Sequence, residues 1–331
     1  MADPFRAALH PLGNADARAT YRRLFAASPQ ASVYSDLPFA DAACEAFGFS
    51  GHLVLVTAEG DDTPRAGLVL FERTRGPLRA AALPPAAEYV TPLLATWPGE
   101  ADLHARGSAL DRLLALVAER TDQASFRLHP SVTDVRPFQW AGWTVTPAYQ
   151  YEAPLPSGEA PESVWRRYPR KTLRKHRDAY LVEKGREYVG AVIALAEQSL
   201  GRKGMAAPSE ALHLLADALM VAGQAEAFVA LTAESGTPEA GIIAAFDDTD
   251  RPDPAGYYWT VGSVPGPAMT VLVGHVAEAL RSRGCTRLVF GGANVPSVAE
   301  FKRGFGSALV PCYRARRVGH PALRLLDRFR T

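Results

Sequence analysis

The apolar residues of the chain follow two periods, alternating with polar residues in some segments and recurring every three to four residues in others. The first period predicts strands and the second predicts helices. Strands are predicted at 52–59, 65–74, 77–85, 125–130, 143–153, 226–234, 239–247, 256–263, 286–290 and 308–318. Helices are predicted at 16–27, 108–121, 189–200, 209–222, 268–283 and 296–303. Residues 28–39 are expected to form a loop, and the whole pattern predicts an α/β chain with a mixed, α+β sheet.

The two halves of the chain end in similar segments. From Phe138 the sequence reads FQWAGWTVTPAYQYE, and from Phe301 it reads FKRGFGSALVPCYRARR. Both give Phe, then Gly with an aromatic residue, an apolar strand and Pro-x-Tyr, and both follow a helix and a short strand. Such self-similarity is typical of a tandem duplication. We therefore predict one domain at 1–153 and a second at 160–331, with the Pro/Gly/Ser/Glu-rich segment 154–163 between them. The alternative is chance similarity between two common helix–strand units.

The second copy differs from the first by a lysine, Lys302, in its short helix. On a helical wheel Lys302 lies at the border of the apolar face, so its stem can follow apolar surface while its ammonium reaches the sheet edge. The preceding Gly291 and Gly292 allow a sharp turn and a close backbone approach, and Asn294 or Ser297 is the expected helix cap. A lysine fixed beside such a turn can stabilise an oxyanion or a phosphate. A surface lysine on a capping helix is the alternative.

The segment GGANVPSVAEFKRGFGSALVPCYRARR resembles the C-terminal signature of the Fem-type branch of the GNAT superfamily, with its Gly-Gly turn, Phe-Lys-x-x-Phe-Gly and last strand with Pro and Tyr. RGCTRLVFGGAN and the basic YPRKTLRKHRDAYLVEKG are similar to the same family, so the resemblance covers about residues 160–318. The first half resembles the family only in layout. The resemblance implies tandem GNAT-like domains, each a mostly antiparallel central sheet flanked by helices, and acyl transfer to an amine. It also implies that Lys302 stabilises charge as an ester carbonyl is attacked.

The acyl donor implied by the resemblance is aminoacyl-tRNA, as in the peptidoglycan-bridge enzymes, or acyl-CoA, as in other GNAT relatives. The place of the CoA pyrophosphate loop, 259–272, holds Gly262 and Gly266 but no leading Arg or Gln. Pro265 and Pro267 each remove an N–H donor there, which favours aminoacyl-tRNA. The residues expected to bind the donor are Gly262, Ser263, Val264, Gly266, Ala268, Gly291, Gly292, Asn294 and Phe301.

The basic segment 166–177 could meet the phosphates of a tRNA or of a nucleotide-linked acceptor, or it could be a solvated helix face. The acceptor would be an amine on a small molecule or on a cell-envelope precursor, and the lack of a long heptad run disfavours a peptidoglycan acceptor. The residues expected to bind phosphate or acceptor are Arg167, Arg170, Lys171, Arg174, Glu88 and Tyr89.

A base or water relay must take protons from the attacking amine. Tyr257, Tyr258 and Glu88 are the candidates that the sequence leaves open, and Tyr258 is grouped with Lys302 as catalytic. Asp247 is expected to be a turn residue instead.

Composition narrows the function classes. The 331 residues are 47% hydrophobic and carry a net charge of +1, so the chain is globular and has no overall basic field. Three distant cysteines indicate neither a metal site nor a disulfide framework. No signal peptide or membrane span is recognised, so a cytoplasmic protein without a metal is expected. An acyl- or aminoacyltransferase with aminoacyl-tRNA as favoured donor is the main prediction. The alternatives are an acyl-CoA-dependent N-acetyltransferase and a non-catalytic RNA- or polyanion-binding module, which would not need Lys302.

Overall fold

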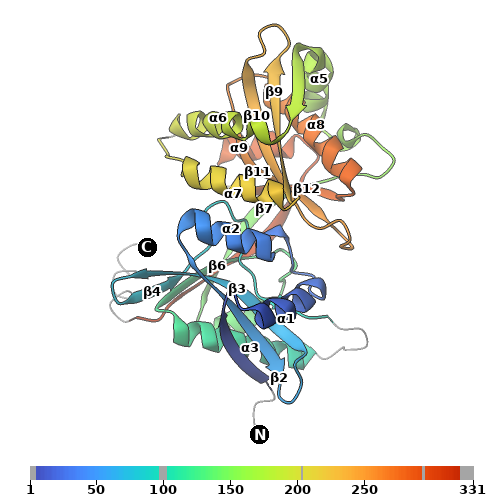
Figure 1. Cartoon of the computed structure of the whole chain (residues 1–331). Coiled ribbons are helices and arrows are strands. Elements are labelled where there is room, and N and C mark those ends of the chain that lie inside the picture. The colour runs from blue at the N-terminus through green and yellow to red at the C-terminus, as the bar shows by residue number, and fades with distance from the viewer. Residues whose placement is uncertain (1–4, 97–102, 203, 293–294, 321–331) are drawn as a thin grey trace. The chain divides into compact units, whose positions relative to one another are not determined.

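The structure is a computed structural model that describes residues 5–96, 103–202, 204–292 and 295–320, the side chains of 103–106 excepted. It divides into two compact units (Figure 1). Unit 1 comprises Met1–Ala148 and Pro311–Thr331, and unit 2 comprises Tyr149–Val310. Each unit holds its own run of neighbouring strands and its own helices, so each is described by itself.

Unit 1 is built on a mostly antiparallel sheet with the strand order β1-β2-β3-β4-β6-β13, in which only β4 and β6 pair in parallel. Side-chain alternation along β3 directs Gly67 toward α1 and Glu72 toward Arg120 of α3, so these two helices cover opposite faces. Its elements are β1 (Phe5–Pro11), α1 (Ala15–Ala26), η1 (Val33–Ser35), α2 (Leu37–Phe47), β2 (Ser50–Ala58), β3 (Pro64–Arg75), β4 (Leu78–Ala81), β5 (Leu93–Leu94), α3 (Leu103–Arg120), β6 (Gln123–Leu128), α4 (Arg136–Trp140) and the first part of β7 (Thr144–Pro154).

Unit 2 has the strand order β7-β12-β11-β10-β9-β8, in which only β11 and β12 pair in parallel. Helix α6 packs on one face of the sheet and α8 on the other (Figure 1). Its elements are the remainder of β7, η2 (Pro161–Val164), α5 (Arg167–His176), η3 (Arg177–Ala179), β8 (Tyr180–Lys184), η4 (Arg186–Tyr188), α6 (Val189–Gly201), α7 (Ser209–Val221), β9 (Ala225–Thr232), β10 (Pro238–Phe246), β11 (Ala255–Ser263), α8 (Ala268–Arg283), β12 (Arg287–Gly292), α9 (Pro296–Arg303) and the first part of β13 (Ala308–Val318).

The two halves of the chain share one order of elements. Strand, two helices, three strands, helix, strand, short helix and strand occur from β1 to β7 and again from β8 to β13, apart from the short β5 and the 3₁₀ turns. Each half also places its one parallel pair around its long central helix, α3 or α8. The predicted α/β class with mostly antiparallel sheets flanked by helices is confirmed.

The last strand of each half begins in one unit and ends in the other. β7 enters unit 2 at Tyr149 and pairs with β12, and β13 enters unit 1 at Pro311 and pairs with β6. The compact units therefore divide at 148/149 and at 310/311, whereas the sequence boundaries at 153 and 160 were placed by composition. A strand that continues from one compact unit into the other carries no compositional signal of the kind that marks a linker.

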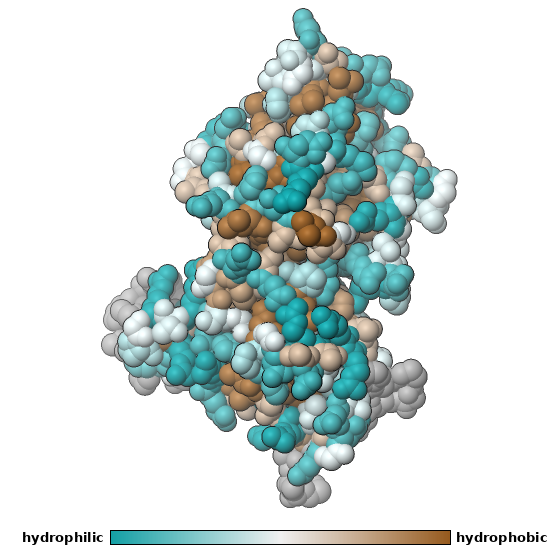
Figure 2. All heavy atoms as spheres, viewed as in Figure 1, coloured by the Kyte–Doolittle hydropathy of each residue, from teal (hydrophilic) through white to brown (hydrophobic). Residues whose placement is uncertain are grey.

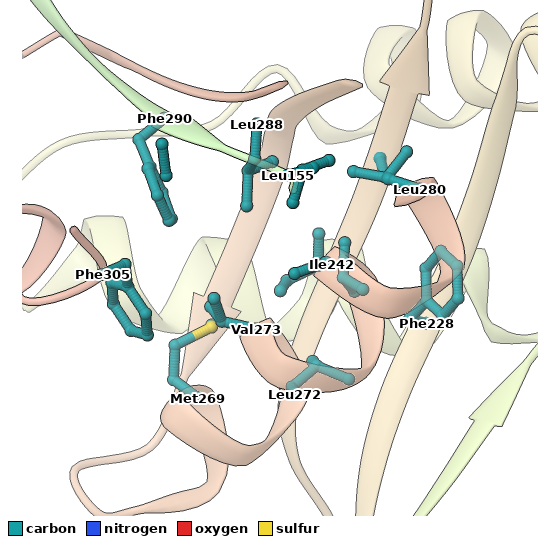
Figure 3. Close-up of a cluster of buried hydrophobic side chains, with 14 of the residues drawn as sticks. Leu155, Phe228, Ile242, Met269, Leu272, Val273, Leu280, Leu288, Phe290 and Phe305 are labelled. Carbon is teal, nitrogen blue, oxygen red and sulfur yellow. The ribbon is translucent and has the colours of Figure 1, made fainter. Parts of the chain in front are cut away.

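The core of unit 2 lies between the sheet and α8. Ile242 of β10 meets Leu272 and Val273 of α8, and Phe290 and Phe305 close one end of the cluster (Figure 3). On the opposite face, Gly241 and Gly262 are cross-strand partners directly beneath α6. A Cβ on Gly262 would lie 2.1 Å from the carbonyl carbon of Leu195, so α6 rests on bare backbone there. Close helix–sheet packing therefore accounts for Gly262.

Several elements differ from the sequence prediction. The loop predicted over 28–39 is wrong at its end, because α2 begins at Leu37 after the capping Asp36. β1 and β8 were not predicted, and both are edge strands whose few residues carry a weak alternation. β12 extends through the two glycines to Gly292 instead of ending at residue 290.

Candidate functional site

Strands β11 and β12 of unit 2 run in parallel and then part. Their pairing joins Ala255–Tyr257 to Arg287–Val289, whereas β11 continues to Ser263 and β12 to Gly292. Within the described residues no pairing joins them beyond Tyr257. Beyond that point the facing backbone edges of the two strands are not paired with each other, and such a wedge between parting strands is a common place for a ligand.

Aromatic rings line the base of this wedge. The rings of Tyr258 and Phe290 lie 5.3 Å apart, and Phe290 stacks on Phe305 at 5.3 Å (Figure 3). Phe301 and Trp165 each meet Phe305 edge-on, at 4.9 and 4.8 Å. This apolar wall lowers the local dielectric, which strengthens any charge interaction formed beside it.

Lys302 is the buried residue of α9, with 7% of its surface exposed. Its Nζ donates a hydrogen bond of 2.8 Å to the carbonyl oxygen of Gly292, at the end of β12. The wheel prediction that its ammonium reaches the sheet edge is confirmed, although the side chain lies deeper than a border position. Its neighbour Arg303 is exposed and pairs with Glu300 at 2.8 Å. One cation of this helix is thus held at the sheet and the next is in solvent.

Gly291 and Gly292 belong to a bulge in β12. The register between β12 and β7 shifts between Val289 and Gly291, and Gly291 has φ +69°, a left-handed value that favours glycine. The bulge turns the end of β12 and aims the Gly292 carbonyl at Lys302. Asn294 lies outside the described residues. Val295 stands at the helix cap and gives no side-chain hydrogen bond, so Ser297 does not cap α9.

Gly304 and Gly306 let η2 and the first turn of α5 dock on the end of α9. A Cβ on Gly304 would lie 2.8 Å from Cγ of Pro169, and a Cβ on Gly306 would lie 2.3 Å from the carbonyl oxygen of Val164. Gly306 also has φ +72°. The N–H of Arg166 donates to the Gly304 carbonyl at 2.9 Å. The glycines after Lys302 therefore fix the start of the basic helix two residues from that lysine.

Helix α5 presents a row of cations. Arg167, Arg170, Lys171 and Arg174 are three or four residues apart, so they share a face, and they line a cavity of about 320 Å³. In the part of the chain that the structure describes, no ion pair or hydrogen bond engages these four side chains. Arg167 and Arg170 also lie in the first turn, where the helix dipole disfavours cations. Helix stability does not explain this arrangement, whereas an anionic ligand would.

No protein-family model matches the sequence, and no curated protein matches it. Solved structures do. FemX aligns over 94% of this chain and 98% of its own with a TM-score of 0.72 at 12% identity. A tandem GNAT protein from the clavulanic acid biosynthesis pathway aligns over 96% and 99% with a TM-score of 0.59 at 14% identity.

This is a Fem-type GNAT fold. The C-terminal domain of a lysylphosphatidylglycerol synthetase from Agrobacterium fabrum, described as putative, also has it, aligning over 96% of this chain and 97% of its own with a TM-score of 0.57 at 14% identity. At these identities the likeness concerns the fold, and the chemistry must be argued from the residues present.

The predicted donor loop of this Fem-type GNAT fold uses much of its hydrogen-bonding capacity internally. The N–H of Ser263 donates to Ser199 Oγ at 3.1 Å, and the N–H of Val264 donates to the Glu239 carbonyl at 2.9 Å. Gly266, with φ +153°, leads into α8, whose first residue Ala268 is fully buried. The loop therefore offers fewer N–H groups to a pyrophosphate than its sequence spacing indicates.

Glu88 and Tyr89 belong to unit 1, and their partners lie within it. Glu88 pairs with Arg127 at 2.6 Å. Tyr89 is 2% exposed, and its ring packs edge-on against His129 at 4.9 Å. Internal packing and ion pairing therefore occupy both residues.

The candidate bases differ in what their surroundings permit. Burial raises the pKa of Tyr258 well above its ordinary value, so its hydroxyl stays protonated at neutral pH and could donate a hydrogen bond rather than take a proton. The hydroxyl of Tyr257 donates to Asp247 at 3.2 Å. Asp247 lies in the connection between β10 and β11, where it is buried and also accepts from the N–H of Ala255 at 3.1 Å.

Sequence reasoning missed Gln150 and Glu152 of β7. Gln150 is fully buried and lies cross-strand from Gly292, the acceptor of the Lys302 hydrogen bond. Its Nε2 donates to Glu152 at 2.7 Å, and Glu152 also meets Arg287 at 3.4 Å. This polar row therefore continues from the end of β12 into β7. Its only sequence signal was a glutamine between two tyrosines in a predicted strand.

The described residues contain no group of three or more His, Cys, Asp or Glu that could hold a metal ion. Among the described helices, none combines the length and apolar character that a membrane span requires. Polar residues dominate the face shown in Figure 2, with apolar ones in small groups.

Proposed function

We propose that the protein is an aminoacyltransferase that moves an aminoacyl group from an aminoacyl-tRNA to an amine. One observation carries the proposal: the buried ammonium of Lys302 lies two residues from the point where the cationic helix α5 docks on α9. A charge-stabilising group and a phosphate-binding face are thereby held on one rigid support.

The chemistry assigns a role to Lys302. The amine nitrogen attacks the ester carbonyl carbon, and negative charge develops on the carbonyl oxygen. The ammonium of Lys302, held at the end of β12, stabilises that charge. The ester C–O bond then breaks, and the hydroxyl of the terminal ribose leaves with the proton that the amine gives up.

The position of the cations favours the tRNA donor over acyl-CoA. In an aminoacyl-tRNA the nearest phosphate belongs to the same nucleotide as the reacting ester, whereas in acyl-CoA the whole pantetheine arm separates phosphate from thioester. The row on α5 begins at Arg167, three residues after Val164, which touches Gly306 beside the Lys302 helix. The loop before α8 also favours tRNA, because the N–H groups of Ser263 and Val264 are already bonded within the protein and cannot bind a CoA pyrophosphate.

Charge reversal on α5 is expected to weaken tRNA binding in a salt-dependent way. Arg167→Glu/Lys171→Glu should lower the affinity for charged tRNA and reduce the slope of log K against log salt by about two, one for each lost phosphate contact. The measurement is a titration of bulk charged tRNA at two salt concentrations, with acetyl-CoA titrated in parallel.

The matched control is Arg22→Glu/Arg75→Glu, which makes the same net charge change at two exposed positions of unit 1. It should leave the slope unchanged. An equal loss of tRNA affinity in both double variants would show that binding depends only on the net charge of the protein. Saturable acetyl-CoA binding without tRNA binding would instead support the acyl-CoA-dependent alternative, and tRNA binding without transfer would support a binding module.

A further inference from the structure

A second cavity lies on the other side of the α5 arginine row. It has a volume of about 450 Å³, within the range of small-ligand pockets. All of its walls belong to unit 2: Ala160 and Glu162 come from η2 and its cap, Arg170, Leu173 and Arg174 from α5, Arg177 from η3, and Gly274, His275 and Glu278 from α8.

One wall of this cavity is cationic. Arg170, Arg174 and Arg177 follow one another at intervals of four and three residues, so their guanidinium groups point to one side of the helix. Within the described residues, Arg177 alone of the three has an ion pair, a 3.9 Å contact with the exposed Asp178. Guanidinium groups in such a row can bind a phosphate through two parallel hydrogen bonds.

The facing wall carries hydrogen-bond acceptors. Glu278 is held by Arg281 through two bonds of 2.6 and 3.0 Å, and these bonds lower its pKa, so it is an oriented carboxylate. Burial, with Arg177 nearby, lowers the pKa of His275, so its imidazole is neutral at pH 7. Within the described residues, no ion pair joins Glu278 to the three arginines across the cavity. The cavity thus keeps the two charges apart.

The floor between these walls is apolar. A Cβ on Gly274 would lie 3.2 Å from both methyl carbons of Leu173 and 3.5 Å from the ring of Trp165. Because Gly274 has no side chain, this apolar surface is not obstructed, and a planar ring can lie against it. Trp165 in turn packs on Phe305, next to the Lys302 helix.

We propose that this cavity binds a nucleoside phosphate. The phosphate would lie against the arginine row, the base against Leu173 and Gly274, and the ribose hydroxyls or base amino groups would donate to Glu278 and His275. A bare anion would use only one wall. A nucleoside phosphate could be a free nucleotide or an unpaired nucleotide of an RNA. The site therefore stands whichever acyl donor the protein uses.

The test measures binding of adenosine 5′-monophosphate, adenosine and inorganic phosphate to the full chain. Adenosine monophosphate should bind at least about tenfold more tightly than either half of it. Arg177→Gln should weaken its binding by about tenfold, the loss of one charge-assisted hydrogen bond. Ala160→Trp should abolish binding by filling the cavity from an exposed position, without a change in charge.

Two control variants separate this cavity from its neighbours. Arg167→Gln alters a residue that lines the 320 Å³ cavity on α5 but not the nucleotide cavity. Ser157→Trp adds the same bulk as Ala160→Trp at an exposed position of the loop before η2. Both should leave nucleotide binding within twofold of the unmodified protein. Binding no tighter than that of inorganic phosphate, or binding sensitive to Arg167→Gln and insensitive to Ala160→Trp, would overturn the proposal.

Competition then assigns the source of the nucleotide. If a short oligoribonucleotide ending in CCA displaces adenosine monophosphate, the cavity takes an RNA nucleotide, and if it does not, the cavity takes a free one. Either result leaves the site supported. Failure of tRNA to bind in the salt titration would remove the proposed donor without touching this site, because Arg167 and Lys171 lie outside the cavity.

Discussion

Replacement of Lys302 by methionine is expected to slow acyl transfer by about 10²–10³-fold, the usual cost of removing one oxyanion donor. Methionine keeps an unbranched apolar stem in the buried position and removes only the ammonium that meets the Gly292 carbonyl. Because that carbonyl loses its partner, the free energy of unfolding should also fall by about 1–3 kcal/mol. The rate should be measured under single-turnover conditions at a temperature where the variant is folded.

Arg303→Met is the matched control for this prediction. It removes the next cation of the same helix, which is exposed and paired with Glu300. An exposed ion pair of this kind contributes about 0–1 kcal/mol, so transfer should be almost unchanged. A Lys302→Met variant that keeps a rate within about threefold of the unmodified protein would show that the ammonium does not act on the reacting carbonyl.

Substitution of Gly262 by alanine is expected to destabilise unit 2 by about 3 kcal/mol, at the upper end for overpacking. The new Cβ would lie 2.1 Å from the Leu195 carbonyl carbon and 2.2 Å from the Ala196 nitrogen, and backbone cannot move aside as a side chain can. The measurement is the thermal midpoint of the full chain. Donor affinity per folded molecule should stay the same.

Gly190→Ala provides a control of opposite sign. Gly190 lies in α6 with open space at its Cβ position, so alanine there should stabilise the helix by about 0.5–1 kcal/mol. An unchanged thermal midpoint for Gly262→Ala, together with weakened donor binding, would contradict the packing role and restore Gly262 to the donor loop.

Much of the fold could be predicted from the sequence because caps and apolar periods are local features of the chain. The long helix α8 ends at Gly284 in a left-handed conformation, as a glycine C-cap predicts. The missed helix α2 had similar signals, since Asp36 caps its start and Gly48 ends it with φ +67°. Its first three residues end the segment SPQASVYSDLPF, whose Ser, Pro and Asp residues are typical of a loop, and a loop was therefore predicted there.

The passage of β7 and β13 from one unit to the other, and the contacts of the glycines, could not be predicted from the sequence for a different reason. Gly262 resembles a loop glycine in the printed sequence, and only the approach of α6 shows what its missing side chain permits. Likewise, Gly304 and Gly306 simply follow Lys302 in the sequence, and what they permit depends on Pro169 and Val164, more than a hundred residues earlier. Contacts between distant segments are set by tertiary packing, which local pattern does not encode.

The candidate site was predicted in part. The sequence singled out Lys302 and the basic segment, and the structure joins them through Gly304. The sequence could not show that Tyr89 would be buried, because its ring packs against Tyr34 and His129 from distant segments. Nor could it show that Gln150 would lie beside Gly292, because that depends on the register of β7 and β12.

The most direct test of the central claim is transfer from a defined donor to hydroxylamine, a small amine nucleophile that needs no acceptor site. The protein is mixed with charged tRNA or with acetyl-CoA, and the hydroxamate product is measured by mass in a single turnover. We predict an aminoacyl hydroxamate from charged tRNA that depends on Lys302, and no acceleration with acetyl-CoA. Acetyl hydroxamate from acetyl-CoA, with none from charged tRNA, would contradict the account.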